Sequence, residues 1–216
     1  TFAAAQPSFT PEAAAAAREM FDAVHREVMV GQYLDVLEQA RGEFSVEAAQ
    51  RVVRLKTAKY TVERPLLIGA ASAGAPAATL SALSRYGIAV GEAFQLRDDL
   101  LGVFGDPAMT GKPAGDDLRE GKRTVLVALA VRDADATGRS LLRSGLGDAA
   151  MDEDAIDALR AVLIGSGAAA AVEDMIGERL AEGLRAIADG ADGGLLRPDA
   201  ARALVALARA AAERDA

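Results

Sequence analysis

The chain has 216 residues, a length that suits one hydrophobic core, so we expect a single helical domain over residues 1–216. Its formal net charge of -8 argues against a nucleic-acid partner, because such binding depends on a basic surface that neutralises phosphates. The sequence has no cysteine and one histidine, His25, which excludes disulfides, thiolate nucleophiles, cysteine-based zinc sites and multi-histidine metal sites within one chain.

Helical periodicity of the apolar residues runs through nearly the whole chain, and no strand-like alternation competes with it. Thr10 and Pro11 have the residue types of a helix cap and first turn, whereas Pro65 predicts a kink or interruption inside the second helix. Met29, on the first helix, is expected in the core. The predicted helices cover about residues 10–40, 45–72, 77–104, 124–135, 151–163, 168–188 and 198–212. We therefore predict an all-α fold, a bundle of antiparallel helices around a central cavity.

Membrane and leader segments are not predicted. No apolar run approaches the roughly 20 residues that a membrane-spanning helix needs, and no charged, apolar leader opens the sequence. We therefore expect a cytoplasmic protein without a transmembrane segment. The first residue is Thr1 rather than methionine, which we interpret as a sign of a processed, truncated or partial chain.

Asp98 and Asp99 are adjacent on the third predicted helix, with Gln95 about one turn earlier on the same face. Apolar residues flank them, and charges in apolar surroundings need compensation. Carboxylate oxygens are the ligands that hard divalent cations such as Mg²⁺ prefer, and nearby cations neutralise a diphosphate. The pattern predicts a site for Mg²⁺ and a diphosphate, although an acidic pair by itself is more often an exposed turn.

Residues 105–121 form the one long segment without helical periodicity. A loop of this length inside a helical domain is usually functional or without fixed structure. Lys112 and Lys122 stand at its two ends, among glycines that permit movement, and can close on an anion held by metal. The alternative is a solvated loop whose charges balance one another.

Lysine is rare and unevenly placed: only four of the 24 basic residues are lysines. Two lie in the loop, and the other two, Lys56 and Lys59, flank Thr57. A lysine is a compact point charge that arginine does not replace opposite a phosphate. Chance with codon bias is the competing explanation, and a threonine inside a helix often bonds its own backbone. Gln32 and Asp35 lie one turn apart on the first helix, where ordinary surface polarity explains them equally well.

Four motifs in this order resemble the trans-isoprenyl diphosphate synthases, in the bacterial geranylgeranyl and farnesyl diphosphate synthase group. They are GQYLD at residues 31–35, KTA at 56–58, FQLRDD at 94–99 and GKPAGDDLREGKRT at 111–124. The resemblance implies an isoprenoid synthase fold and a Mg²⁺-dependent head-to-tail prenyltransferase, usually a homodimer. Its substrates would be isopentenyl diphosphate and an allylic diphosphate. The implied product is geranylgeranyl diphosphate, with farnesyl diphosphate next.

The resemblance also implies roles for individual residues. Asp98 would be the main Mg²⁺ ligand, with Asp99 beside it. Asp35 would support a metal, and Asp117 matches the acid of the last motif. The residues implied to meet substrate are Lys56, Thr57, Gln95, Lys112, Lys122 and Gln32, the last also orienting Asp35.

Two departures from the family pattern matter. Position 102 is glycine where the second aspartate-rich motif often has a third aspartate, so one supporting carboxylate is missing. The first aspartate-rich motif is absent between Thr1 and Val30. We therefore interpret the chain as the C-terminal part of such a synthase and expect activity only when that motif is present. The alternatives are a noncatalytic partner subunit of a synthase and an acidic helical scaffold that binds proteins through an apolar face.

Overall fold

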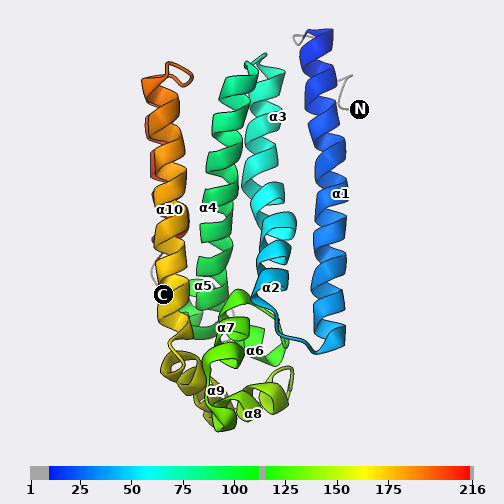
Figure 1. The fold of residues 1–216 in the computed structure, drawn as a ribbon, viewed down its shortest axis with the longest axis vertical. Helices are drawn as coiled ribbons and strands as arrows, with labels where there is room; N and C mark the ends of the chain where they lie inside the picture. The colour runs from blue at the N-terminus through cyan, green and yellow to red at the C-terminus, as the bar shows by residue number, and fades with distance from the viewer. Residues whose placement is uncertain (1–9, 112–114, 215–216) are drawn as a thin grey trace.

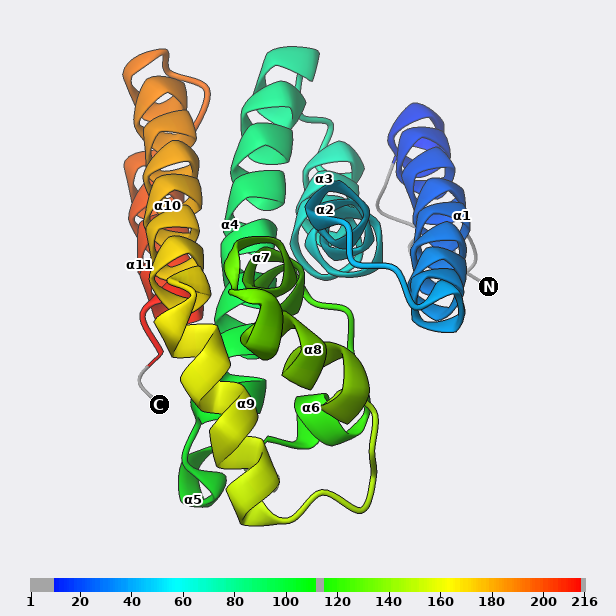
Figure 2. The same ribbon diagram turned by 60° about the horizontal axis from the view of Figure 1, so that its bottom comes forward.

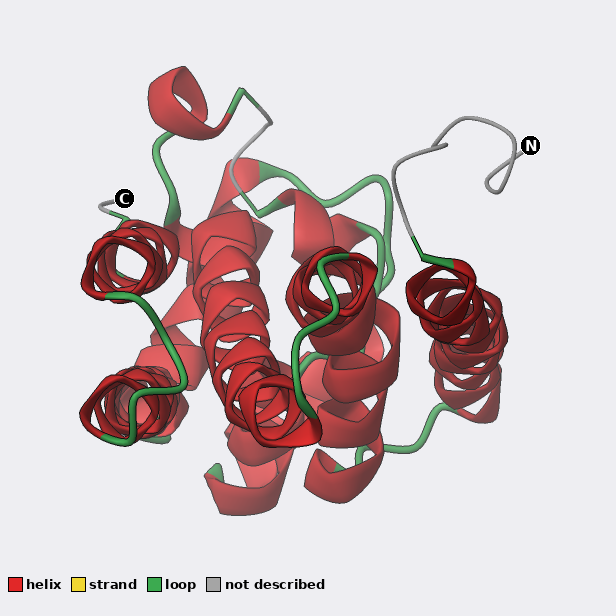
Figure 3. Cartoon of the chain, turned by 90° about the horizontal axis from the view of Figure 1, so that it is seen from above, coloured by secondary structure: helices red, strands yellow, loops and turns green. Residues whose placement is uncertain are grey.

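The computed structural model describes residues 10–111 and 115–214, and every element within these ranges is helical (Figure 3). The predicted all-α class is therefore confirmed. The elements are α1 (Pro11–Arg41), α2 (Val46–Val52), the π-helix η1 (Val53–Glu63), α3 (Arg64–Ser72), α4 (Ala77–Phe104), α5 (Pro107–Thr110), α6 (Asp116–Arg119), α7 (Val125–Asp133), α8 (Ala136–Gly145), α9 (Glu153–Gly165), α10 (Ala168–Asp192) and α11 (Pro198–Ala212).

The long helices stand side by side, and the short helices α5–α9 gather at one end of the bundle (Figures 1 and 2). Helix α4 is central: it packs against η1 and α3 on one side and against α10 and α11 on the other. Helix α1 covers η1 and α3 from the outer edge. Since α4 is buried on several sides, its apolar and small residues are spread around the helix rather than along one stripe.

The core has two parts along α4. At the end with the short helices, Leu96, Leu100 and Val103 pack with α7, α9 and the start of α10. Toward the other end, Leu83 and Tyr86 pack with α3, α10 and α11. The hydroxyl of Tyr86 donates to the carbonyl oxygen of Leu204 at 2.7 Å, which satisfies the one polar group of this buried ring.

The outer face of α1 is uncovered and partly apolar. Met29 is 71% exposed, so its assignment to the core is wrong. Periodicity shows which residues share a helix face, but it does not show which element covers that face. The large exposed apolar residues of α1 are Phe21, Met29, Val30, Tyr33 and Val36.

The second predicted helix has the expected extent, but its central part is not an α-helix. The eleven residues of η1 form wide π-helical turns between α2 and α3. The chain stays helical through Pro65, the second residue of α3, so the helix is not interrupted there, although it changes from π-helical to α-helical turns just before the proline. A proline ring in a regular α-helix collides with the carbonyl four residues earlier. The residue four before Pro65 lies in the π-helical turns of η1, so the geometry there is not that of a regular α-helix.

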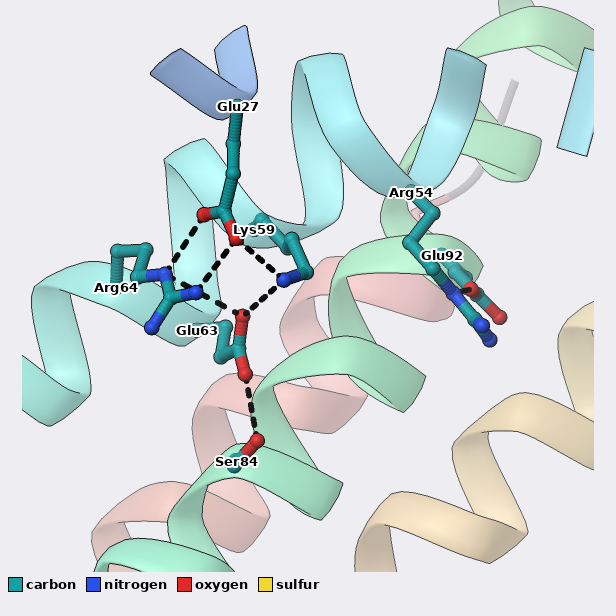
Figure 4. A network of polar contacts seen from close by, with 7 residues as sticks. All are labelled: Glu27, Arg54, Lys59, Glu63, Arg64, Ser84 and Glu92. Atoms are coloured by element: carbon teal, nitrogen blue, oxygen red, sulfur yellow. Dashed lines mark hydrogen bonds and ion pairs between the residues drawn. The ribbon is translucent and has the colours of Figure 1, made fainter. Parts of the chain in front are cut away.

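A partly buried network of charges ties α1 to η1, α3 and α4 (Figure 4). Glu27 accepts hydrogen bonds from Lys59 at 2.6 Å and from Arg64 at 2.6 and 2.8 Å. Glu63, which is only 3% exposed, accepts from the Ser84 hydroxyl at 2.5 Å. Burial alone would raise the pKa of Glu27, but the hydrogen bonds from Arg64 and Lys59 outweigh it and lower the pKa. The network therefore contributes to stability while Glu27 is ionised.

Replacing Glu27 by alanine is expected to lower the free energy of unfolding by about 2 kcal/mol, because the partly buried Lys59 and Arg64 lose their short hydrogen bonds to it and keep only the longer ion pairs to Glu63, at 3.9 and 3.8 Å. Urea denaturation measures the change. The exposed Glu19 on the same helix provides the control, since Glu19→Ala should change stability by less than about 0.5 kcal/mol. Because the pKa of Glu27 is lowered in the fold, the difference between the wild type and Glu27→Ala should shrink as pH falls through that pKa. Equal stability of the two variants at pH 7 would contradict the role of the network.

Within the described residues, no single helix has the length and apolar character needed to cross a membrane. Helices α9 and α10 meet those criteria only when taken together, across a bend of 62°.

Candidate diphosphate and metal site

Polar residues from four separate segments line one cavity of about 230 Å³. The segments are the end of α1, the α2–η1 helix, the second half of α4 and the turn before α7. The structure thus brings together most of the residues singled out in the sequence. The polar lining residues are Asp35, Lys56, Thr57, Gln95, Asp98, Asp99, Lys122, Arg123 and Thr124.

Two short side-chain contacts connect η1 to its neighbours at this cavity. The ammonium group of Lys56 donates to Asp35 Oδ2 on α1 at 2.6 Å. The hydroxyl of Thr57 donates to Gln95 Oε1 on α4 at 2.6 Å, and Gln95 Nε2 in turn donates to Asp99 Oδ1 at 2.7 Å. The Gln95 amide is therefore held at both ends, which fixes its orientation in the wall of the cavity.

Asp98 and Asp99 differ sharply in their surroundings, as expected for adjacent helical residues that point about 100° apart. The side chain of Asp98 is 53% exposed, whereas Asp99 is only 5% exposed. Burial raises the pKa of Asp99 to about 8; the hydrogen bond from Gln95 opposes this shift, and the negative charges of Asp117 and Asp98 add to it. A carboxylate in this position is ionised at neutral pH only with help from a nearby cation.

The raised pKa of Asp99 predicts that the stability of the fold depends on pH. Its pKa is raised in the fold, so the folded chain holds a proton that the unfolded chain releases above pH 4. In the absence of divalent cations, we expect this group to reduce stability progressively as pH rises from about 4 to about 8. Asp99→Asn keeps an oxygen for Gln95 and should remove that loss. Chemical denaturation of both proteins at pH 5 and pH 8 measures the effect, and parallel pH profiles would contradict it.

Asp117 on α6 does not line the cavity itself but contacts Lys122, which does. Its carboxylate accepts a hydrogen bond from Lys122, whose ammonium also lies 3.2 Å from Glu120 Oε2. A Cβ atom added to Gly102 would lie 2.1 Å from Asp117 Oδ2, so this carboxylate fills the space beside the glycine. The departure at position 102 therefore does not leave the neighbourhood short of an acid, since Asp117 reaches it from another helix.

Two arginines lie near the cavity: Arg123, a cation of the last motif to which the sequence assigned no role, and Arg214, which was not predicted. Arg123 stacks on Phe44, with its guanidinium carbon 4.1 Å from the ring centroid. Arg214 stacks on Phe94 at 4.6 Å and lies 4.0 Å from Asp98 Oδ1. Arg123 follows a predicted lysine directly, but Arg214 lies far along the chain from Phe94 and carries no local signal.

Two predicted residues, Gln32 and Asp117, do not line the cavity. Gln32 is exposed and is not among the residues that line the cavity, and the contacts of Asp35 go to Lys56 and Gln39 rather than to Gln32. Asp117 acts through Lys122 instead of lining the cavity. Lys112 lies outside the described residues.

The donor set fits Mg²⁺ bound together with a diphosphate. Among the residues that the structure describes, no group of three or more metal-binding side chains could hold an ion by itself. Mg²⁺ is usually bound through one or two carboxylates, with water and substrate phosphates completing six oxygen ligands. Asp98 and Asp99 supply such oxygens at the cavity, and the buried Asp99 gains a partner for its charge when a cation binds.

A larger cleft of about 610 Å³ between α2, η1, α4, α7 and α10 is a weaker candidate. Its rim carries both arginines and glutamates, and these compensate one another. Arg54, for example, donates to Glu92 at 2.7 Å (Figure 4). The smaller cavity, with the buried carboxylate of Asp99, has the stronger need for a bound ion.

Comparison with known proteins agrees with this chemistry. The polyprenyl synthetase family model matches residues 3–163. The chain is 39% identical over 138 residues to the geranylfarnesyl diphosphate synthase of Aeropyrum pernix, covering 64% of this chain and 42% of that protein. It is 32% identical over 163 residues to the geranylgeranyl diphosphate synthase of Mycobacterium tuberculosis, covering 76% and 46%.

A solved structure extends the likeness to nearly the whole fold. The geranylgeranyl pyrophosphate synthase of Corynebacterium glutamicum, complexed with isoprenyl diphosphate and magnesium, is 40% identical, with a TM-score of 0.89. The match covers 96% of this chain and 57% of that one. The chain thus spans less than half the length of the curated relatives that it matches. It belongs to the polyprenyl synthetase family.

Proposed function

We propose that this chain carries the half of a short-chain prenyl diphosphate synthase that binds an allylic diphosphate with Mg²⁺. One observation carries the proposal: acids, lysines and a fixed amide from four segments meet in one small cavity. An acidic scaffold that binds other proteins would not require this arrangement, and the family membership also argues against it.

The cavity residues suit the first step of such a reaction, in which the bond between carbon and diphosphate breaks. Lys56 and Lys122 place positive charge at the cavity, which favours the state with more charge on the leaving diphosphate. Mg²⁺ held by Asp98 and Asp99 would supply further charge neutralisation. The exposed position of Asp98 makes it the more accessible of the two carboxylates.

Thr57 and Gln95 suit the carbon side of the same step. Their side-chain oxygens, 2.6 Å apart, lie in the cavity wall, and the Asp99 contact holds the amide of Gln95 in place. Fixed oxygen dipoles stabilise positive charge that develops on a carbon atom beside them. The double bond of isopentenyl diphosphate would then attack that carbon, and a proton would be lost from the adduct.

The product and the assembly are finer parts of the proposal. Geranylgeranyl diphosphate is the first expected product and farnesyl diphosphate the second. A relative named geranylgeranyl diphosphate synthase and one named (2E,6E)-farnesyl diphosphate synthase both match this chain. A homodimer in the cytoplasm is also proposed. The uncovered apolar residues of α1 support a further contact on that face, because large exposed apolar patches often mark interfaces.

Chromatography of prenyl products tests the function. The complete gene product would be incubated with labelled isopentenyl diphosphate and with dimethylallyl, geranyl or farnesyl diphosphate, with and without Mg²⁺. A longer prenyl diphosphate formed only with Mg²⁺ is expected. If the complete gene product forms none with any of these allylic substrates, the enzyme assignment is overturned and a noncatalytic partner subunit becomes the better assignment.

A further inference from the structure

Two glycines on neighbouring helices touch the backbone of η1 at the residues that carry the site. Helix η1 lies between α1 and α4, so the contacts come from opposite sides (Figures 1 and 2). A Cβ atom added to Gly31 of α1 would lie 2.7 Å from the backbone nitrogen of Lys56. One added to Gly91 of α4 would lie 2.5 Å from the Cα atom of Ala58. The two contacts fall on the residues directly before and after Thr57.

These contacts leave no room for a side chain. Each of the closest atoms belongs to the η1 backbone, so a change of rotamer could not relieve the overlap. A π-helical turn is wider than an α-helical turn, which brings its backbone closer to neighbouring helices. Glycine, having no Cβ atom, allows this close approach.

Each glycine is paired with one of the site's hydrogen bonds. Asp35, which accepts from Lys56, lies four residues after Gly31 on α1. Gln95, which accepts from Thr57, lies four residues after Gly91 on α4. Residues four apart lie on the same helix face. The glycine contacts therefore set the spacing between helices at which both hydrogen bonds form, each at 2.6 Å.

We propose that Gly31 and Gly91 are positioning residues that hold Lys56 and Thr57 in the geometry needed to bind and ionise the allylic diphosphate. The inference rests on the proposed function for its kinetic consequences. The placement of η1 by the two glycines can be tested without any assay of activity.

Other glycines provide matched controls. Gly87 of α4 makes an equally tight contact with η1, because an added Cβ would lie 2.6 Å from the Cα atom of Glu63, but it lies at the end of η1 away from Lys56. Gly69 of α3 is also helical, and nothing lies within 4 Å of the position of its added Cβ. Alanine at Gly87 disturbs packing on η1, whereas alanine at Gly69 disturbs nothing.

The kinetic experiment compares the four glycine-to-alanine variants in the complete gene product. Gly31→Ala and Gly91→Ala are expected to lower kcat/KM for the allylic diphosphate roughly 100-fold, as displacements of about 1 Å do. The KM for isopentenyl diphosphate should change much less. Gly87→Ala should lose thermal stability to a similar degree while its kinetics stay within about 3-fold of wild type, and Gly69→Ala should be unchanged or slightly more stable. Kinetic losses that follow the melting temperature across all four variants would overturn the proposal.

A milder variant covers the case in which added methyl groups prevent folding. The methyl group of Ala58 would lie 2.8 Å from a Cβ atom at Gly91, and Ala58→Gly removes it without adding any atom. This variant loosens the contact from the other side, so we expect a several-fold rise in the allylic KM. Wild-type kinetics in a folded Ala58→Gly protein would count against the positioning role of Gly91.

Hydrogen exchange separates this inference from the proposed function. Gly31→Ala and Gly91→Ala should speed amide exchange around residues 56–58, whereas Gly87→Ala should act at the end of η1. If the wild-type protein makes no prenyl product, the proposed function fails, yet this exchange pattern would still support the placement of η1 by the two glycines. Unchanged exchange at residues 56–58 in both variants would refute that placement even in an active enzyme.

Discussion

Asp98→Ala is expected to lower Mg²⁺-dependent turnover of the complete gene product by roughly 10²–10³-fold, because a lost metal contact removes several kcal/mol of charge stabilisation from the transition state. The fold should not suffer, since the Asp98 side chain is 53% exposed and its ion pair with Arg214 spans 4.0 Å. Steady-state kinetics over a range of Mg²⁺ concentrations, with circular dichroism of the same samples, measures both effects.

The control for Asp98 is an exposed aspartate on another long helix. Asp174 of α10 meets this description, and Asp174→Ala should leave turnover within about 2-fold of wild type. A need for higher Mg²⁺ concentrations in Asp98→Ala, but not in Asp174→Ala, would identify the lost interaction as one with metal. Unchanged kinetics in a folded Asp98→Ala protein would remove Asp98 from the site.

Lys122→Met should act on both stability and substrate binding. The carboxylate of Asp117 is only 6% exposed, and without Lys122 it loses its hydrogen-bonded cation, which should cost about 2 kcal/mol of unfolding free energy. The KM for the allylic diphosphate should rise roughly 10- to 100-fold, as expected for loss of one cation beside a phosphate. Chemical denaturation and steady-state kinetics measure the two effects independently.

A double variant separates the two roles of Lys122. Lys122→Met combined with Asp117→Asn removes the unpaired buried charge, so most of the lost stability should return. The allylic KM should stay high, because the cation at the cavity is still missing. Recovery of both properties together would mean that Lys122 serves the fold alone.

The fold class follows from local signals that the structure confirms. Thr10 caps α1 by accepting from the backbone of Ala13 at 3.2 Å, and Ser45 caps α2 in the same way through Ala48 at 3.2 Å. Such caps, together with apolar residues at helical spacing, depend on nearby sequence alone. They are therefore readable from the sequence before any packing is known.

The errors lie where distant parts of the chain decide the structure. Helix α8 was not predicted: its ten residues carry only two large apolar side chains, Leu141 and Leu142, and of these the structure fully buries Leu142. Short helices α5 and α6 lie within the segment expected to be irregular. The backbone of η1 lies against glycines of two other helices, and no local propensity reports such a contact.

In the candidate site, too, some features could be predicted from the sequence, whereas others depend on distant parts of the chain. The four motifs identify residues that the fold gathers into one cavity. Each motif lies on one of the four segments that line it, namely α1, η1, α4 and the turn before α7. The contact of Asp117 with Gly102, and the stacking of Arg214 on Phe94, join residues far apart in the sequence. These contacts depend on where α6 and the C-terminal end of the chain pack, which requires the three-dimensional structure.

Helix α4 carries Gly91, Gln95, Asp98 and Asp99 on one continuous stretch, and this has a consequence for evolution by insertion and deletion. One residue added between Gly91 and Gln95 would turn both aspartates by about 100° and shift them by about 1.5 Å relative to η1. No substitution could restore the alignment of the aspartates. Gly91 must stay in contact with η1, and the insertion would have changed the number of residues between Gly91 and the aspartates. Relatives that keep this site should therefore differ in the residues of this stretch but not in its length, and length changes should collect in the turns between helices.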